Sequence, residues 1–196
     1  MRRREFAVRT SYWSKSSAWS LKGGKTAEIA RCWAMIGNSQ KRLVVIGNSG
    51  SGKSTLAERV GAALKLPTYD LDLLHWEADG RKRDKAEAKA LVAGVAAGET
   101  WVVEGVYGWL AEMALARATM LVWLDLSWAE CREGLLHRGL RRGMAPSDHD
   151  ALVAWASAYW TRETPSSFAG HDLLFRKFSG DKLRLRTRAE VSAFSA

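Results

Sequence analysis

The chain has 196 residues, which suits one domain with a single core, and charged side chains interrupt every apolar run before it reaches the roughly 18 residues of a membrane span. We therefore expect a soluble protein with no membrane partner. Cys32 and Cys131 lack the spacing of a zinc site or a disulfide framework, which favours a reducing, cytoplasmic setting. The net charge of +9 would indicate a nucleic-acid partner if it lay on the folded domain, but most of it precedes that domain.

The basic charge belongs to the start of the chain. Residues 1–42 hold ten Lys and Arg side chains against two acidic ones, whereas residues 43–196 hold 20 basic and 19 acidic side chains. Residues 1–34 also lack clear helical or strand periodicity. We expect residues 1–34 to be a disordered basic extension, or sequence added by a misassigned start codon, and residues 35–196 to form the folded domain. Nucleic-acid binding is not expected, and the oligomeric state stays open.

From Arg42 onward, apolar runs alternate with helical patterns, as in parallel α/β proteins. The spacing predicts strands at residues 42–46, 67–72, 100–105, 118–125 and 181–186. Helices are predicted from near Lys53 to Leu66, over 85–97, from Ser127 to about His137, over 147–163, and after Thr187. Capping-box patterns mark the third and the last of these helices. With right-handed crossovers, the pattern predicts a three-layer α/β/α domain around a five-stranded parallel sheet.

The first strand is followed by the stretch GNSGSGKST, which matches the GxxxxGK[ST] pattern of a phosphate-binding loop. Its glycines allow backbone N–H groups to turn toward phosphates, and the helix that follows adds its positive N-terminal end. Lys53 is expected to reach the β- and γ-phosphates, and Ser54 to offer its hydroxyl to Mg²⁺. The predicted nucleotide-binding residues of this P-loop NTPase motif are Gly47, Asn48, Ser49, Gly50, Ser51, Gly52, Lys53, Ser54 and Thr55.

The motifs of other P-loop classes are missing from the sequence. A GTPase would carry DxxG and NKxD, and a transporter ATPase would carry an LSGGQ-like stretch, none of which is present. The chain is also too short for a typical helicase or ring ATPase core. A small kinase remains, with ATP and Mg²⁺ as cofactors and an acceptor that is a nucleotide or a small molecule.

Acidic residues end two of the predicted strands. Glu104 closes the third strand, where its carboxylate is expected to order the magnesium shell beside Ser54 through a bound water. Asp70 and Asp72 end the second strand, and alternation would point both carboxylates to one side. One of the two could bind a water of the magnesium shell while the other accepts a hydrogen bond from the acceptor hydroxyl, the role we expect for Asp72. Capping of the next helix is an equal alternative for Asp70 and a weaker one for Asp72.

A cluster of basic residues follows the fourth strand. Guanidinium groups match phosphate oxygens in a two-pronged geometry, and the flanking glycines would allow a lid at about residues 137–147 to close. A solvated helix end is the alternative. The predicted phosphate-contacting arginines are Arg138, Arg141 and Arg142, beside His137, with Arg162 as a weaker candidate.

Taken together, LVVIGNSGSGKSTLAERVGAALKLPTYDLDLLHW, WVVEGVYG, the arginine cluster and LRLRTRAEVSAF resemble the adenylate-kinase-related P-loop proteins often labelled topology modulation proteins. The resemblance covers about residues 42–194. It implies a nucleoside-monophosphate-kinase-like fold, ATP, Mg²⁺ and a closing lid. Two positions depart from the family pattern: Glu104 stands where Asp is usual, and Asp70 creates a DxD that resembles shikimate-kinase-type enzymes.

The same resemblance places Arg188 against the adenine base, and Trp76, Tyr107 and Trp109 on the acceptor side. Core packing is a strong alternative for these aromatic residues. The leading functional hypothesis is an ATP-dependent phosphotransferase for a nucleotide or a small hydroxylated metabolite. The alternatives are a nucleotide-dependent regulator associated with DNA topology and an ATP-binding module without catalysis.

Overall fold

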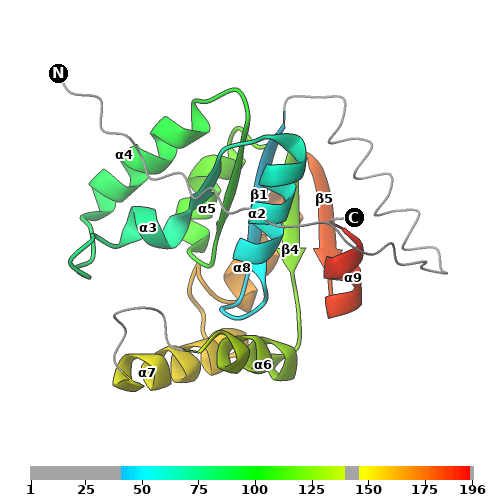
Figure 1. Cartoon of the computed structure of the whole chain (residues 1–196). Coiled ribbons are helices and arrows are strands. Elements are labelled where there is room, and N and C mark those ends of the chain that lie inside the picture. Colours follow the sequence, from blue (N-terminus) through cyan, green and yellow to red (C-terminus); the bar gives the residue numbers. More distant parts are fainter. Residues whose placement is uncertain (1–40, 140–145, 195–196) are drawn as a thin grey trace.

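The structure is a computed structural model that describes residues 41–139 and 146–194 (Figure 1). The predicted extension at residues 1–34 lies outside the described residues, as do Arg141 and Arg142 of the predicted lid. Among the described helices, none has the length and apolar character needed to cross a membrane.

The centre of the fold is a five-stranded parallel sheet with strand order β2-β3-β1-β4-β5. This confirms the predicted sheet. Each strand ends at the same edge, and Figure 1 shows the arrows pointing toward the side where α6 and α7 lie. The strands are β1 (Arg42–Gly47), β2 (Thr68–Asp70), β3 (Trp101–Gly105), β4 (Met120–Leu124) and β5 (Asp181–Leu185).

Helices cover both faces of the sheet. Alternate residues of β1 enter two separate hydrophobic clusters: Leu43 and Val45 pack toward α2, and Val44 and Ile46 pack toward α4, α5 and α8. The three-layer α/β/α prediction is therefore confirmed. The helices are α2 (Lys53–Leu64), α3 (Leu71–His75), α4 (Lys85–Ala96), α5 (Gly108–Leu115), α6 (Trp128–Arg138), α7 (Pro146–Ser157), the 3₁₀ helix η1 (Ala158–Trp160), α8 (Phe168–Lys177) and α9 (Arg188–Ala193).

Local capping explains where two helices begin. Ser127 and Glu130 form the predicted reciprocal capping box at the start of α6. At α9, the Thr187 hydroxyl accepts from the Glu190 N–H as predicted, but the Glu190 carboxylate accepts from the backbone N–H of Arg186 instead of Thr187. Both caps hold their helices at the carboxyl edge of the sheet.

The prediction that the second strand runs to residue 72 was wrong. The strand ends at Asp70, whose carboxylate accepts a hydrogen bond from the backbone N–H of Asp72 at 2.7 Å and caps the short helix α3. Asp70 and Asp72 therefore do not alternate along a strand. Asp72 lies in the first turn of α3, so its direction is set by helical geometry.

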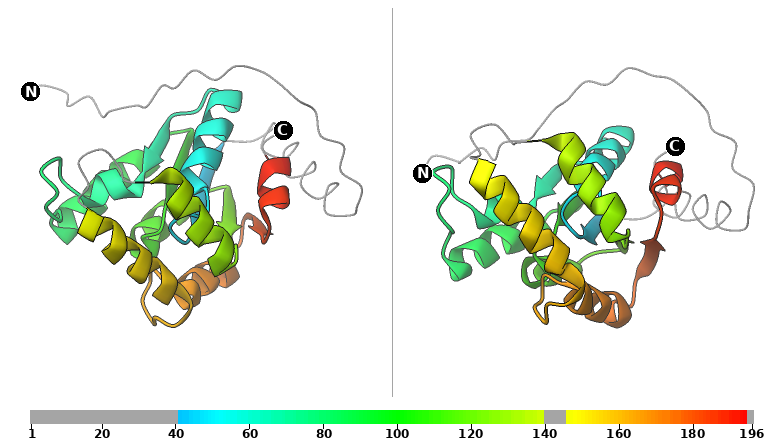
Figure 2. Two further views of the ribbon diagram at one scale, coloured as in Figure 1. Left: turned by 60° about the horizontal axis from the view of Figure 1, so that its bottom comes forward. Right: turned by 90° about the horizontal axis from the view of Figure 1, so that it is seen from below.

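The carboxyl edge of the sheet is crossed by α6 and α7, as the view from below in Figure 2 shows. The phosphate-loop sequence, the first turn of α3 and the end of β3 all meet at this edge. In parallel α/β sheets, ligands bind at this edge, where the chain leaves the strands.

Candidate functional site

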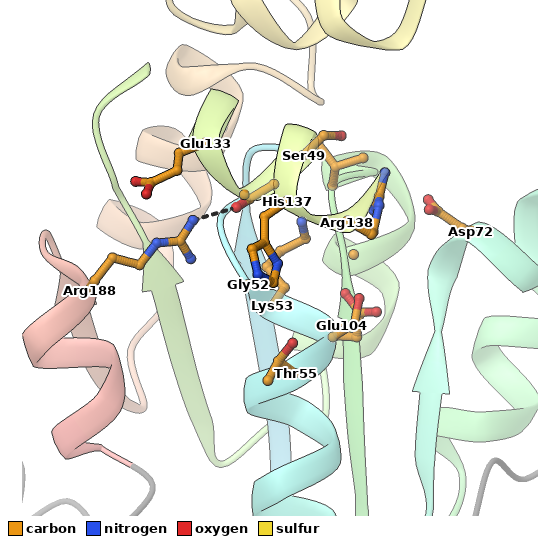
Figure 3. Close-up of a pocket in the computed structure, with 15 residues that line it drawn as sticks. Ser49, Gly52, Lys53, Thr55, Asp72, Glu104, Glu133, His137, Arg138 and Arg188 are labelled. Carbon is orange, nitrogen blue, oxygen red and sulfur yellow. Dashed lines mark hydrogen bonds between the residues drawn. The ribbon is translucent and has the colours of Figure 1, made fainter. Parts of the chain in front are cut away.

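A cavity of about 580 Å³ opens at the carboxyl edge of the sheet (Figure 3). Five segments contribute to its walls: the phosphate loop with the start of α2, the first turn of α3, the end of β3 with Val106, the last two turns of α6 and the start of α9. Its lining residues are Ser49, Gly50, Gly52, Lys53, Ser54, Thr55, Asp72, Glu104, Gly105, Val106, Glu133, Gly134, His137, Arg138 and Arg188.

The phosphate loop turns sharply between β1 and α2. Gly50 and Gly52 have φ angles of 78° and 93°, a region that residues with a Cβ rarely adopt. Lys53 is only 8% exposed, and its Nζ donates to the backbone carbonyl of Asn48 at 2.9 Å, across the loop. The loop therefore has the closed shape of an anion cradle with its lysine folded over it.

Three predicted loop residues lie beneath the cavity instead of lining it. Gly47, Asn48 and Ser51 are buried. The Asn48 side chain accepts from the Ser49 N–H at 2.8 Å and donates to the Ala156 carbonyl, near the end of α7, at 2.9 Å. Asn48 thus ties the loop to the segment that follows the predicted lid.

Arg188 supports the outer side of the phosphate loop. Its guanidinium donates to the carbonyls of Ser51, Gly50 and Glu130, each at 2.8 Å. The sequence predicted adenine stacking for this residue and missed these contacts, two of which join residues more than 130 positions apart. The side chain also lines the cavity, so the stacking role stays a prediction.

The loop packs closely against α6. A Cβ at Gly134 would lie 2.2 Å from the Gly50 carbonyl oxygen and 2.6 Å from Nη2 of Arg188. Gly134 and its neighbour Glu133 were missed as site residues. A glycine inside a helix costs stability relative to alanine, so its presence in α6 was the one available signal of a close approach.

Glu104 is the buried acid of the site. Its side chain is 3% exposed, β1 lies on one side of it, and Asp70 is its register partner in β2. The nearby Ser54 hydroxyl favours the charged form of its carboxylate. Burial, helped by the negative charge of Asp70, raises the pKa of Glu104 from 4.5 to about 7, despite the opposing effect of Lys53.

Asp72 faces the phosphate loop from the opposite wall of the cavity. In Figure 3 its carboxylate points into the cavity from α3, with Glu104 between it and the loop. Trp76, Tyr107 and Trp109 do not line the cavity: their rings pack around His75, one turn beyond Asp72. The indole of Trp76 donates to the Tyr107 hydroxyl at 2.9 Å. These aromatics therefore support the wall that carries Asp72.

The basic residues predicted to contact phosphate divide into three groups. Arg138 and His137, in the last turn of α6, line the cavity. Arg141 and Arg142 lie outside the described residues. Arg162 is absent from the cavity wall, since its guanidinium stacks on Trp155 at 3.8 Å and donates to the Ser166 carbonyl at 3.2 Å.

The site offers the small number of protein oxygen ligands that Mg²⁺ takes beside phosphates. Among the residues that the structure describes, no group of three or more His, Cys, Asp or Glu side chains could enclose a metal ion. Mg²⁺ in nucleotide sites keeps several waters and takes one or two protein ligands beside the phosphates. The Ser54 hydroxyl and the Glu104 carboxylate, which both line the cavity, fit that smaller requirement.

Replacing Gly134 by alanine tests the contact between α6 and the loop. Helix propensity alone would favour alanine by about 1 kcal/mol, but overpacking against the loop carbonyl is expected to reverse the sign and to cost about 1–3 kcal/mol. Urea denaturation measures the difference. Gly94→Ala in α4 is the matched control, because a Cβ there meets nothing within 4 Å. Equal stabilisation by both substitutions would contradict the close contact.

A second expectation concerns Glu104 and pH. Because its folded pKa is raised, the folded protein keeps a proton that the unfolded chain loses, so stability falls as pH rises from 4.5 to about 7, by up to about 1.4 kcal/mol per pH unit. Glu104→Gln removes this loss. The unliganded variant should be more stable than the wild type at pH 8, with the difference shrinking near pH 5. Glu112→Gln, at an exposed site on α5, is the control; a variant less stable than the wild type at pH 8 would refute the assignment.

Comparison with known proteins identifies the fold. No family model matches the sequence, and no curated protein matches it either. Among solved structures, a gluconokinase from Sinorhizobium meliloti 1021 is 21% identical, with 80% of this chain and 89% of that chain covered and a TM-score of 0.50. A shikimate kinase from Acinetobacter baumannii in complex with shikimate is 12% identical, with 82% and 92% covered and a TM-score of 0.50.

A sugar kinase from Janibacter sp. HTCC2649 gives a similar result, with 16% identity, 80% and 90% covered and a TM-score of 0.50. At identities this low, the comparisons establish that the proteins share a fold, and they do not identify the reaction that this protein catalyses. The narrower resemblance to topology modulation proteins stays a prediction. The chain has the nucleoside-monophosphate-kinase-like P-loop fold, which it shares with structures of small-molecule kinases.

Proposed function

We propose that this protein is an ATP-dependent phosphotransferase that acts on a small hydroxylated molecule or a nucleotide. One observation carries the proposal: the phosphate loop with Lys53 and the carboxylate of Asp72 face each other across a single cavity, with Glu104 between them. Phosphoryl transfer depends mainly on positioning and charge neutralisation, so a donor cradle opposite an acceptor-orienting acid is the arrangement that it requires.

The nucleotide half uses the loop and its neighbours. Backbone N–H groups and the N-terminal end of α2 bind the phosphates, and Lys53 exchanges its bond to the Asn48 carbonyl for phosphate oxygens. Ser54 and Glu104 would hold Mg²⁺, directly and through water, and the ion supplies charge neutralisation when bound. Arg138 reaches the transferring group from the end of α6, joined by Arg141 and Arg142 of the proposed lid.

The acceptor half is centred on Asp72. Its carboxylate accepts a hydrogen bond from the acceptor hydroxyl and aligns that oxygen with the γ-phosphate. The structurally similar proteins are a gluconokinase, a sugar kinase and a shikimate kinase, which supports a hydroxylated small molecule as the first class to test. The cavity of about 580 Å³ lies within the range of small-molecule sites.

The test measures ADP release from MgATP by the full chain with a panel of acceptors: nucleoside monophosphates, nucleosides, shikimate, gluconate and simple sugar acids. We expect one class to stimulate release. Lys53→Met should abolish ATP binding, because it removes the cation that contacts the phosphates. Asp72→Asn should leave the Kd for ATP nearly unchanged and lower kcat by about 10²- to 10⁴-fold.

Asp79→Asn is the matched control for Asp72. Asp79 is an exposed acid on the turn between α3 and α4, where it pairs with Arg81 outside the cavity, so its substitution should leave turnover at the wild-type level. Full activity in Asp72→Asn would reject its acceptor role. Intact ATP binding without turnover on any acceptor would reject the kinase assignment in favour of a regulatory or purely nucleotide-binding protein.

A further inference from the structure

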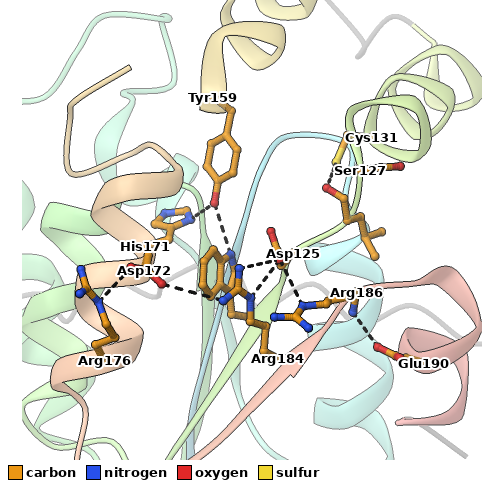
Figure 4. Close-up of polar contacts among 12 residues, drawn as sticks. Asp125, Ser127, Cys131, Tyr159, His171, Asp172, Arg176, Arg184, Arg186 and Glu190 are labelled. Carbon is orange, nitrogen blue, oxygen red and sulfur yellow. Dashed lines mark hydrogen bonds and ion pairs between the residues drawn. The ribbon is translucent and has the colours of Figure 1, made fainter. Parts of the chain in front are cut away.

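A chain of buried polar side chains runs beneath the wall of the cavity. Tyr159 of η1 and His171 of α8 are 1% and 0% exposed, and the Tyr159 oxygen lies 2.6 Å from Nδ1 of His171 (Figure 4). The indole nitrogen of Trp123 in β4 lies 3.3 Å from the same Tyr159 oxygen. Nε2 of His171 lies 3.0 Å from the carbonyl oxygen of Val106.

The chemistry of the two ends fixes the direction of every hydrogen bond in this chain. An indole N–H can only donate and a carbonyl oxygen can only accept, so Trp123 donates to Tyr159, and His171 donates from Nε2 to Val106. Complete burial lowers the pKa of His171 to about 3, so the ring is neutral and Nδ1 accepts. Tyr159 must therefore donate to His171, and each bond supports the next.

Both ends of the chain are held in place. The Arg184 guanidinium stacks on the Trp123 ring at 4.0 Å and pairs with Asp125 at 2.8 Å. At the other end, a Cβ on Gly108 would lie 1.9 Å from the Pro165 carbonyl oxygen, so the segment before α8 packs directly against the start of α5. The Val106 carbonyl therefore receives its hydrogen bond from a rigid support.

Val106 connects this support to the cavity. It lies two residues after Glu104, lines the cavity with Gly105, and precedes Tyr107, which bonds to Trp76 on the wall that carries Asp72. Tyr159 is itself three residues after Ala156, whose carbonyl accepts from Asn48 of the phosphate loop. One short stretch, from the end of α7 into η1, thus contacts the phosphate loop and, through His171, the wall beside the proposed acceptor position.

We propose that Tyr159 and His171 are positioning residues that hold the Val106 carbonyl, and with it residues 105–107, at the place where the acceptor must sit relative to the phosphate loop. The acceptor part of this proposal rests on the proposed kinase function. The mechanical part, that this chain of hydrogen bonds immobilises residues 105–107, does not depend on the kinase function. Neither residue touches the cavity, so their influence on catalysis passes through the wall.

The first measurement is amide hydrogen exchange in the unliganded full chain. Tyr159→Phe keeps the ring and removes the O–H that donates to His171. We expect exchange in residues 106–111 to accelerate about tenfold or more, while exchange in α2 stays at the wild-type rate. Met120→Val is the matched control, since Met120 is buried in β4 on the opposite face of the sheet from Trp123, and should not produce this local pattern.

The second measurement separates positioning from general loosening. With the acceptor that the panel identifies, Tyr159→Phe should raise the KM for the acceptor about tenfold and change the KM for MgATP less than twofold. His171→Leu should behave in the same way, and His171→Gln, which can still accept from Tyr159 and donate to Val106, should recover part of the loss.

Two results would overturn the proposal: wild-type exchange at residues 106–111 in Tyr159→Phe, or acceleration there that Met120→Val reproduces. An unchanged KM for the acceptor would overturn its catalytic part. If the wild type shows no acceptor-dependent turnover, the kinase function itself fails, and the exchange measurement still decides whether the chain immobilises the wall.

Discussion

The arrangement of the site depends on how the outer carbonyls of the phosphate loop are satisfied. A loop that turns its N–H groups inward must turn carbonyls outward, and buried carbonyls without partners are costly. Arg188 binds two of them, at Gly50 and Ser51, and a third at Glu130 on α6. This one guanidinium joins the loop, α6 and α9, so the close contact at Gly134 and the position of the cavity wall both follow from it.

A second constraint is electrostatic. Glu104 and Lys53 are both buried at the carboxyl edge, yet the Lys53 ammonium donates to the backbone carbonyl of Asn48. Burial of Glu104, together with the negative charges of Asp70 and Asp72, raises its pKa and makes it easily protonated in the unliganded protein. A site of this kind favours ligands that bring positive charge to the acids and negative charge to the loop. A nucleotide with its metal ion combines both.

Much of the fold could be predicted because its signals are local. The buried runs of the five strands, the capping box at Ser127 and the loop glycines each act within a few residues. Helices α5 and α8 were not identified, since α5 is apolar over most of its surface and α8 contains Gly170 in its first turn. The roles of Arg188 and His171 could not be predicted, because their partners are distant in the sequence. The hydrogen-bond partners of Arg188 are 58 to 138 residues away, and Val106 is 65 residues from His171. The sequence predicted correctly that Asp72 lies at the site, but it placed this residue on a strand. Asp72 lies instead in the first turn of α3, which Asp70 caps.

The position of Arg188 in the last described helix has a consequence for the order of events during folding. Contacts between distant parts of a chain form only after a large loss of chain entropy has been offset by other contacts. β1, the loop and α2 are neighbours in the sequence and can assemble early, but the loop carbonyls gain their partner only when α9 docks beside α6. A folding intermediate with a complete sheet centre would therefore still have an unsupported phosphate loop, and the nucleotide affinity that we propose for this loop would be among the last properties that the chain acquires.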